Sequence, residues 1–176
     1  MASGFRTIGH SNRDLAALID ILQLAKVEVV ADVRSMPRSR NNPVFNINSL
    51  PASLAHYQIE YRHFSDLGGL RNKSHDVDPS INAFWRSTSF HNYADYALTK
   101  QFREAFDELV ELGQRRIVAI MCAEAVWWRC HRRIITDYLL LSGHKVIHLM
   151  GNQREQPATP TPQAKWTENA KVVYPE

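Results

Sequence analysis

Thiol, carboxylate and imidazole side chains are concentrated in one segment in the second half of the chain. Cys122 follows an apolar run, and Glu124 lies two residues further on. Cys130 and His131 come next. A cysteine between a strand and a helix N-terminus is favoured as a thiolate, the nucleophilic form of the side chain. The pattern therefore predicts that Cys122 is a nucleophile or a polarised thiol, with Glu124 or His131 carrying the proton.

Each of these residues also has a structural interpretation, which the sequence leaves open. Cys122 can be a small buried hydrophobe, Glu124 can pair with a neighbouring arginine, and His131 can be a hydrogen-bonded core histidine. The helical period puts His131 on the buried face of the following helix and Arg132 off that face. There Arg132 could reach an anion above the start of the helix. We expect Cys130 to be structural.

The same residue types would suit zinc, but their spacing does not. Cys122 and Cys130 are eight residues apart, which matches neither a CxxC knuckle nor the spacing of paired histidine ligands. His10 could complete a site only through a tertiary contact. We therefore expect no metal ion and no other cofactor.

Polar residues also follow two earlier apolar runs. The turn Gly9-His10-Ser11 offers backbone N–H groups and a hydroxyl to an oxyanion or phosphate, although Ser11 could simply cap the next helix. Asp32 and Arg34 follow the second run and could instead form a structural ion pair. The residues expected to bind a small anionic ligand are His10, Ser11, Asp32, Arg34, Ser39 and Arg132.

Strands that alternate with helices must position these residues. The pattern predicts strands over residues 5–8, 27–33, 59–62, 117–121 and 145–149. It predicts helices over residues 12–22, with Asn12 as the N-cap, 49–57, 100–113 and 128–142. This order indicates an α/β fold, a single domain with a mostly parallel sheet flanked by helices on both faces. Ligands bind such sheets outside the carboxyl ends of the strands, so His10, Asp32 and Cys122 should meet at one edge.

Length and composition fit one globular domain with an added arm. The chain has 176 residues, of which 44% are hydrophobic and 22% charged. Residues 1–150 are predicted to form the α/β domain, and residues 151–176 a proline-containing C-terminal arm that is extended or partly mobile. Residues 64–92 show little periodicity, which is typical of a functional loop or lid.

The remaining sequence features limit the location and the partners. No apolar run approaches the ~18 residues of a membrane span, and no secretory signal is recognisable at the N-terminus. Two cysteines are too few for a disulfide scaffold, so we expect a cytoplasmic protein with no membrane partner. The net charge of +3 is compatible with anionic ligands and does not by itself indicate nucleic acid.

Six short motifs resemble the bacterial and archaeal family catalogued as domain of unknown function 488. They are Thr7-Ile8-Gly9-His10-Ser11, Asp32-Val33-Arg34 with Pro37 and Ser39, Leu67-Gly68-Gly69, Tyr93-Ala94-Asp95-Tyr96, Met121-Cys122-Ala123-Glu124 and Cys130-His131-Arg132. The resemblance runs from residue 7 to about residue 148 and leaves out the tail. It implies the fold and the choice of site residues, and it implies no reaction. Tyr93 and Tyr96 share a helical face, where core packing is the expected role.

The arrangement around Cys122 is also similar in outline to rhodaneses and cysteine phosphatases. Those enzymes use a Cys-x5-Arg loop, whereas here the first downstream arginine is Arg129, seven residues on. The loop also holds Val126, Trp127 and Trp128 in place of glycines. The similarity is one of fold only.

Three hypotheses about function follow from these patterns. The leading one is a cysteine-dependent hydrolase or transferase that acts on a small anionic substrate, phosphorylated or nucleotide-like. The second is a nucleic-acid-associated or ligand-sensing module without turnover, in which Phe45, Trp85, Phe90, Trp127 and Trp128 stack on bases. The third is an interaction domain, with a homodimer as one form, in which the 64–92 loop and the arm serve assembly.

Overall fold

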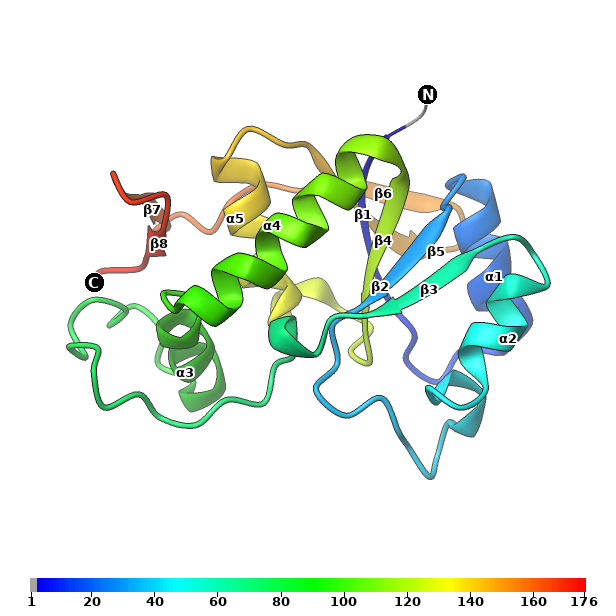
Figure 1. Ribbon diagram of the computed structural model, residues 1–176, viewed down its shortest axis with the longest axis horizontal. Helices are drawn as coiled ribbons and strands as arrows, with labels where there is room; N and C mark the ends of the chain where they lie inside the picture. Colours follow the sequence, from blue (N-terminus) through cyan, green and yellow to red (C-terminus); the bar gives the residue numbers. More distant parts are fainter. Residues whose placement is uncertain (1–2) are drawn as a thin grey trace.

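The apolar runs of the sequence form the inner strands of a six-stranded sheet (Figure 1). The computed structural model describes residues 3–176. The sheet has the order β3-β2-β4-β1-β5-β6. Its strands are β1 (Gly4–Gly9), β2 (Val29–Asp32), β3 (Glu60–His63), β4 (Ile117–Cys122), β5 (Val146–Gly151) and β6 (Arg154–Pro157). All neighbouring pairs are parallel except β5 and β6. Every residue of β2 and β4 is buried, which is why both strands are continuous apolar runs in the sequence.

Helices cover both faces of the sheet (Figure 1). On one side lie α1 (Leu15–Leu24) and α2 (Leu50–Ala55), and on the other α3 (Thr88–Tyr96), α4 (Lys100–Arg115) and α5 (Arg132–Leu141). Successive residues of β4 alternate between the two cores: Ile120 and Cys122 pack on the side of α4 and α5, and Met121 packs on the side of α1. The predicted fold class, a single α/β domain with a mostly parallel sheet, is confirmed.

Three helix boundaries differ from those predicted. α1 begins after Asp14 and not after Asn12. α4 continues through Gly113 to Arg115, and this glycine packs against the Phe5 ring, where there is no space for a Cβ atom. The predicted helix over residues 128–142 is divided into a single turn, η3 (Trp127–Arg129), and α5. His131 therefore caps α5.

The segment 64–92 and the tail pack against this framework. The segment contains one short turn, η2 (Ser65–Leu67), and the beginning of α3. The tail from Gly151 was expected to be extended or partly mobile, but it forms β6 and a hairpin of β7 (Lys165–Trp166) and β8 (Val172–Val173). Tyr174 is fully buried and donates a hydrogen bond to Asp137 Oδ2 at 2.7 Å. The boundary drawn at residue 150 stays a prediction.

The strand registers place three carboxyl ends at one edge of the sheet, the lower edge in Figure 1. Gly9 of β1 is paired with Cys122 of β4, and Asp32 of β2 is paired with Met121. The polar segments that follow these strands are therefore neighbours in space, as the sequence predicts. Within residues 3–176, no helix combines the length and apolar character needed to cross a membrane.

Candidate functional site

Two adjoining cavities lie at this edge. The thiol cavity has a volume of about 340 Å³, and its lining includes Cys122, Cys130, His131, Arg129, Leu70 and Phe90. The turn cavity has a volume of about 480 Å³, and its lining includes His10, Ser11, Asn12, Arg38, Ser39 and Asn42. Four residues, Arg34, Met36, Ala123 and Glu124, line both cavities. They form the wall between the two cavities.

The thiol cavity contains both cysteines in direct contact. Cys122 ends β4, Cys130 lies two residues before α5 begins, and their Sγ atoms are 2.6 Å apart. Both are free thiols and both are buried, yet both contribute to the cavity surface. Cys130 was expected to be structural, and its proximity to Cys122 was missed. This contact depends on how the loop 123–129 folds back, which no spacing in the sequence reveals.

The surroundings of Cys130 favour its thiolate. The backbone N–H of Arg132, in the first turn of α5, donates to Cys130 Sγ at 3.4 Å. Burial by itself raises the pKa of the Cys130 thiol, but the hydrogen bond with Cys122 and the charge and N–H groups of Arg132 outweigh it. Together they lower the pKa to about 7. A substantial fraction of Cys130 is therefore ionised at neutral pH.

The surroundings of Cys122 favour its protonated form. Its Sγ lies 3.6 Å from the backbone carbonyl oxygen of Glu124, which can accept a hydrogen bond from a thiol but repels a thiolate. Burial, followed by the hydrogen bond and the charge of Cys130, raises the pKa of Cys122 well above its ordinary value. Once Cys130 is ionised, Cys122 is the only donor in the pair. The two cysteines are thus chemically different.

His131 is oriented as a proton acceptor for Cys130. Its Nε2 lies 2.7 Å from the carbonyl oxygen of Val33. Because a carbonyl only accepts, Nε2 carries the hydrogen and Nδ1 carries the lone pair. Nδ1 lies 3.5 Å from Cys130 Sγ. Burial is the main cause that lowers the pKa of His131, so the imidazole is neutral at neutral pH and presents the Nδ1 lone pair to the Cys130 thiol. His131 is half-buried, and its contact with Val33 directs the ring toward the edge of the sheet, as the sequence predicts.

Two other motifs hold this imidazole in place. A Cβ atom on Gly69 would lie 2.6 Å from His131 Nδ1, so glycine is required for the close approach of the chain to the ring. The Tyr93 ring packs on His131 with centroids 5.0 Å apart, and the Tyr93 hydroxyl donates to the Leu67 carbonyl at 2.7 Å. Tyr93 is thus a core residue, as expected, and it connects α3 to the Leu67-Gly68-Gly69 segment.

Arg132 corrects one prediction. It was expected to lie off the buried face, but it is only 1% exposed. Its Nη1 donates to Thr7 Oγ1 at 3.1 Å and its Nη2 to the Glu124 carbonyl at 2.8 Å. The first turn of α5 lies beneath the loop 123–129, so a residue that would face solvent on an isolated helix is covered here. Arg132 ties that loop to β1 and provides positive charge close to the thiols.

Asp32 and Arg34 form the structural ion pair that the sequence left as an alternative. Arg34 donates to both oxygens of Asp32, from Nε at 2.9 Å and from Nη2 at 2.7 Å. Nη2 also donates to the Phe45 carbonyl at 2.7 Å, and the Tyr61 hydroxyl donates to Asp32 Oδ2. Asp32 is fully buried and Arg34 is 8% exposed. The charge of Arg34 is therefore compensated within the protein, although its side chain borders both cavities.

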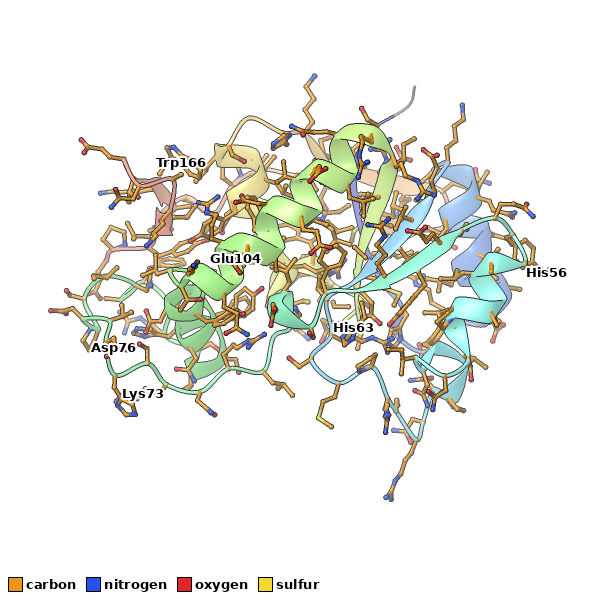
Figure 2. All side chains as sticks on the ribbon, in the orientation of Figure 1. His56, His63, Lys73, Asp76, Glu104 and Trp166 are labelled. Atoms are coloured by element: carbon orange, nitrogen blue, oxygen red, sulfur yellow. The ribbon has the colours of Figure 1, made fainter. Side chains whose placement is uncertain are left out.

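Two histidines, one at the end of β3 and one just after β1, hydrogen-bond to Arg34. Figure 2 shows His63 at the end of β3, and its Nε2 lies 2.7 Å from the Arg34 carbonyl oxygen. His10 Nε2 accepts from Arg34 Nη1 at 3.1 Å, and His10 Nδ1 donates to the Ser11 carbonyl at 2.8 Å. Burial lowers the pKa of His10, so its ring is neutral. Sequence reasoning missed both Tyr61 and His63, since neither lies in one of the six motifs.

The turn after β1 does not offer the free N–H groups that were predicted. The His10 N–H donates to the Cys122 carbonyl at 2.9 Å, and the Ser11 N–H donates to the Ala123 carbonyl at 3.0 Å. Ser11 does not cap α1, whose N-cap is Asp14. Ser39 accepts from the backbone N–H groups of Asn41 and Asn42, so its hydroxyl organises its own loop. These bonds weaken the expected oxyanion pocket at the turn.

The uncompensated charges of the site belong to other residues. Arg129 lines the thiol cavity, Arg38 lines the turn cavity, and both side chains are exposed. In the part of the chain that is described, neither guanidinium forms an ion pair. Glu124 is also exposed, and among the described residues its carboxylate forms no ion pair with an arginine, the pairing that the sequence left as an alternative. The sequence predicts a proton-carrying role for Glu124 and no ligand-binding role for Arg38 or Arg129, which lie in loops without periodicity.

The aromatic side chains that were expected to stack on bases differ in their exposure. Of the aromatic side chains expected to stack on bases, Phe45 and Trp85 are buried, and Trp85 stacks on Phe90 with centroids 4.7 Å apart. Trp128 is exposed, at 44%.

Among residues 3–176, no group of three or more histidine, cysteine or acidic side chains is arranged to hold a metal ion.

Comparison with known proteins gives one match. The model of the family described as "Domain of unknown function DUF488" matches residues 14–139, which is more than half of the chain. Neither the curated proteins nor the solved structures gave a match. The resemblance inferred from the motifs is confirmed, although the motif Thr7–Ser11 lies outside the matched residues. The chain belongs to the DUF488 family.

Proposed function

We propose that this DUF488 family member is a cysteine-dependent hydrolase or transferase that acts on a small anionic substrate, with Cys130 as the nucleophile. The proposal is carried by one observation. Cys130 Sγ lines a cavity and contacts two groups that favour its ionisation, Cys122 Sγ at 2.6 Å and the Arg132 N–H at 3.4 Å, while His131 Nδ1 lies 3.5 Å from the same sulfur. Such an environment is typical of a reactive cysteine.

Cys130 is preferred to Cys122, which the sequence alone suggested as the nucleophile. Cys122 faces a carbonyl oxygen, which opposes a negative charge on its sulfur. Cys130 lies before a ten-residue helix whose first N–H, that of Arg132, donates to the sulfur. When Cys130 is ionised, the single proton of Cys122 turns from the Glu124 carbonyl to the Cys130 sulfur and stabilises the thiolate.

The chemical steps follow from these positions. His131 Nδ1 takes the proton of Cys130, and the thiolate attacks the electrophilic centre of the substrate. The bond to sulfur forms, the bond to the leaving group breaks, and the proton on His131 passes to the leaving group. Water or a second substrate then releases the group from Cys130. The exposed carboxylate of Glu124, on the wall between the cavities, is the general base for this second step.

Recognition of the anion is assigned to Arg129 and Arg38. Both guanidinium groups are exposed and unpaired within residues 3–176, one in each cavity. Arg34 is less suitable for direct binding, because Asp32 compensates its charge. The apolar part of a substrate fits the thiol cavity, whose lining includes Met36, Leu70 and Phe90.

Alkylation kinetics test the proposal. Iodoacetamide and iodoacetate differ in charge, and the second resembles a small anionic substrate. At pH 7, we expect Cys130 in the native protein to react on the order of tenfold faster than in the unfolded chain, because its thiolate is stabilised. We also expect native Cys130 to favour iodoacetate over iodoacetamide more than the unfolded chain does. Peptide mass spectrometry identifies the modified cysteine.

Two variants separate the cysteines. Cys130→Ser should abolish rapid labelling, whereas Cys122→Ser should keep labelling at Cys130 with a reduced rate. A native Cys130 that reacts no faster than the unfolded chain would remove the nucleophile role. Incubation with anionic nitrophenyl esters then tests turnover, and a covalent adduct on Cys130 is the expected intermediate.

A further inference from the structure

We infer that Cys122 and Cys130 form a reversible intramolecular disulfide, and that a small hydroperoxide is the oxidant that generates it. The inference adds a redox modification to the cysteines on which the proposed function rests. It explains a feature that a single-nucleophile enzyme does not need, a second thiol buried against the first. The sulfur atoms are 2.6 Å apart, nearer than two non-bonded sulfur atoms normally approach, although still longer than the covalent S–S distance of about 2.05 Å.

The local structure allows the bond to form without unfolding. Cys122 is fixed at the end of β4, where its backbone belongs to the sheet. Cys130 is fixed by the start of α5 and by the Trp127 carbonyl, which accepts from its N–H at 3.3 Å. The two side chains therefore meet from two rigid elements, and only a small change in side-chain torsion separates contact from bonding. Both sulfurs line the thiol cavity, which gives a small oxidant a route to them.

The oxidation proceeds in two balanced steps. The Cys130 thiolate attacks one oxygen of the hydroperoxide, an S–O bond forms and the O–O bond breaks. The departing oxygen takes the proton that His131 Nδ1 received from Cys130 and leaves as water or an alcohol. Cys130 is then a sulfenic acid. Cys122 attacks this sulfur, the S–S bond forms, the S–O bond breaks, and the hydroxyl leaves as water with the proton of Cys122. Two thiols lose two electrons and two protons, and the peroxide is reduced.

The position of Cys122 gives the pair its selectivity. A sulfenic acid that meets no thiol is open to further oxidation to sulfinic acid, which is in general irreversible. Here the neighbouring thiol is already in contact, so the disulfide forms first. In the disulfide, the Cys130 sulfur is bonded to Cys122 and cannot attack a substrate, so the proposed reaction stops. A dithiol reductant restores both thiols. The DUF488 protein would thus be inactivated by peroxide and protected from permanent damage.

The experiment treats the full-length protein with a small excess of hydrogen peroxide and measures intact mass. We expect the wild-type chain to lose the mass of two hydrogen atoms and to yield a peptide cross-linked between Cys122 and Cys130. Dithiothreitol should reverse the change. In Cys122→Ser, Cys130 should instead accumulate as a sulfenic acid that dimedone traps. In Cys130→Ser, neither product should form at the same peroxide concentration.

Several outcomes would overturn the inference. They are sulfinic acid on wild-type Cys130 without a cross-link, a disulfide between two chains, and no reaction. Circular dichroism of each variant shows whether it is folded. The two proposals also fail separately. Rapid iodoacetate labelling of Cys130 without disulfide formation would support the nucleophile role and contradict the disulfide. Disulfide formation with slow labelling would support the disulfide and contradict the nucleophile role.

Discussion

The two cavities at the edge of the sheet differ in how their polar atoms are used. In the turn cavity, His10, Arg34 and Ser39 are each bonded to other protein atoms. In the thiol cavity, Cys130 and His131 interact with each other and still border open space. Polar residues at a strand end therefore do not by themselves make a reactive site. Reactive groups are those with hydrogen-bonding capacity left after the fold has been satisfied.

The strongest predicted change is the loss of protein stability when the ion pair that borders the turn cavity is broken. Asp32→Ala leaves the buried guanidinium of Arg34 without its carboxylate, and we expect a loss of about 3–5 kcal/mol in the free energy of unfolding. Urea denaturation measures it. Tyr61→Phe, which removes one hydrogen bond to the same carboxylate, is the matched control and should cost about 1 kcal/mol. Equal effects of the two substitutions would show that the ion pair has no special structural role.

The second prediction moves to the thiol cavity. Gly69→Ala forces a methyl group against the His131 ring and should destabilise the protein by about 1–3 kcal/mol. It should also slow Cys130 alkylation, because the displaced imidazole accepts the thiol proton less well. Gly143→Ala is the control: its φ of +97° makes the substitution strained, while no atom lies within 4 Å of the added Cβ. Slower alkylation in both variants would mean that stability alone controls reactivity.

The third prediction is a pH dependence. The pKa of Cys130 is lowered to about 7, so its alkylation rate should rise with pH, reach half of its maximum near pH 7 and level off above about pH 8. In the unfolded chain the same rise should occur at higher pH. Because the pKa of Cys130 is lower in the folded than in the unfolded chain, the folded state gains stability as the pH rises above 7. This contribution is lost as the pH falls through 7. A rate that keeps rising to pH 9 in the native protein would contradict the assignment.

The smallest effect compares the two free arginines. Arg129→Gln should reduce the preference of Cys130 for iodoacetate over iodoacetamide about threefold, because its charge lies in the same cavity as the sulfur. Arg38→Gln, in the turn cavity, should reduce it less. Arg40→Gln changes an exposed arginine of the same loop that lines neither cavity, and it serves as the control. Arg38→Gln as effective as Arg129→Gln would show that the cavities act as one electrostatic unit.

The sequence predicts the framework well because burial on both faces of a strand leaves a clear apolar run. The strand at β4 and the shared edge of β1, β2 and β4 follow from such runs and from the general behaviour of parallel sheets. The chemistry within the edge is harder to predict. Helical periodicity placed Arg132 on an exposed face, but it carries no information on a loop that covers the first turn. The contact of Cys130 with Cys122 likewise depends on that loop.

The backbone carbonyl of Glu124 contacts both the Cys122 thiol and the Arg132 guanidinium. It accepts from Cys122 Sγ and from Arg132 Nη2, and Gly9 approaches it so closely that no other residue fits. The orientation of one amide plane therefore governs both the thiol and the guanidinium. A rotation of that plane would withdraw the acceptor from both at once. The protonation of Cys122 and the placement of Arg132 are consequently linked through the orientation of this one peptide group.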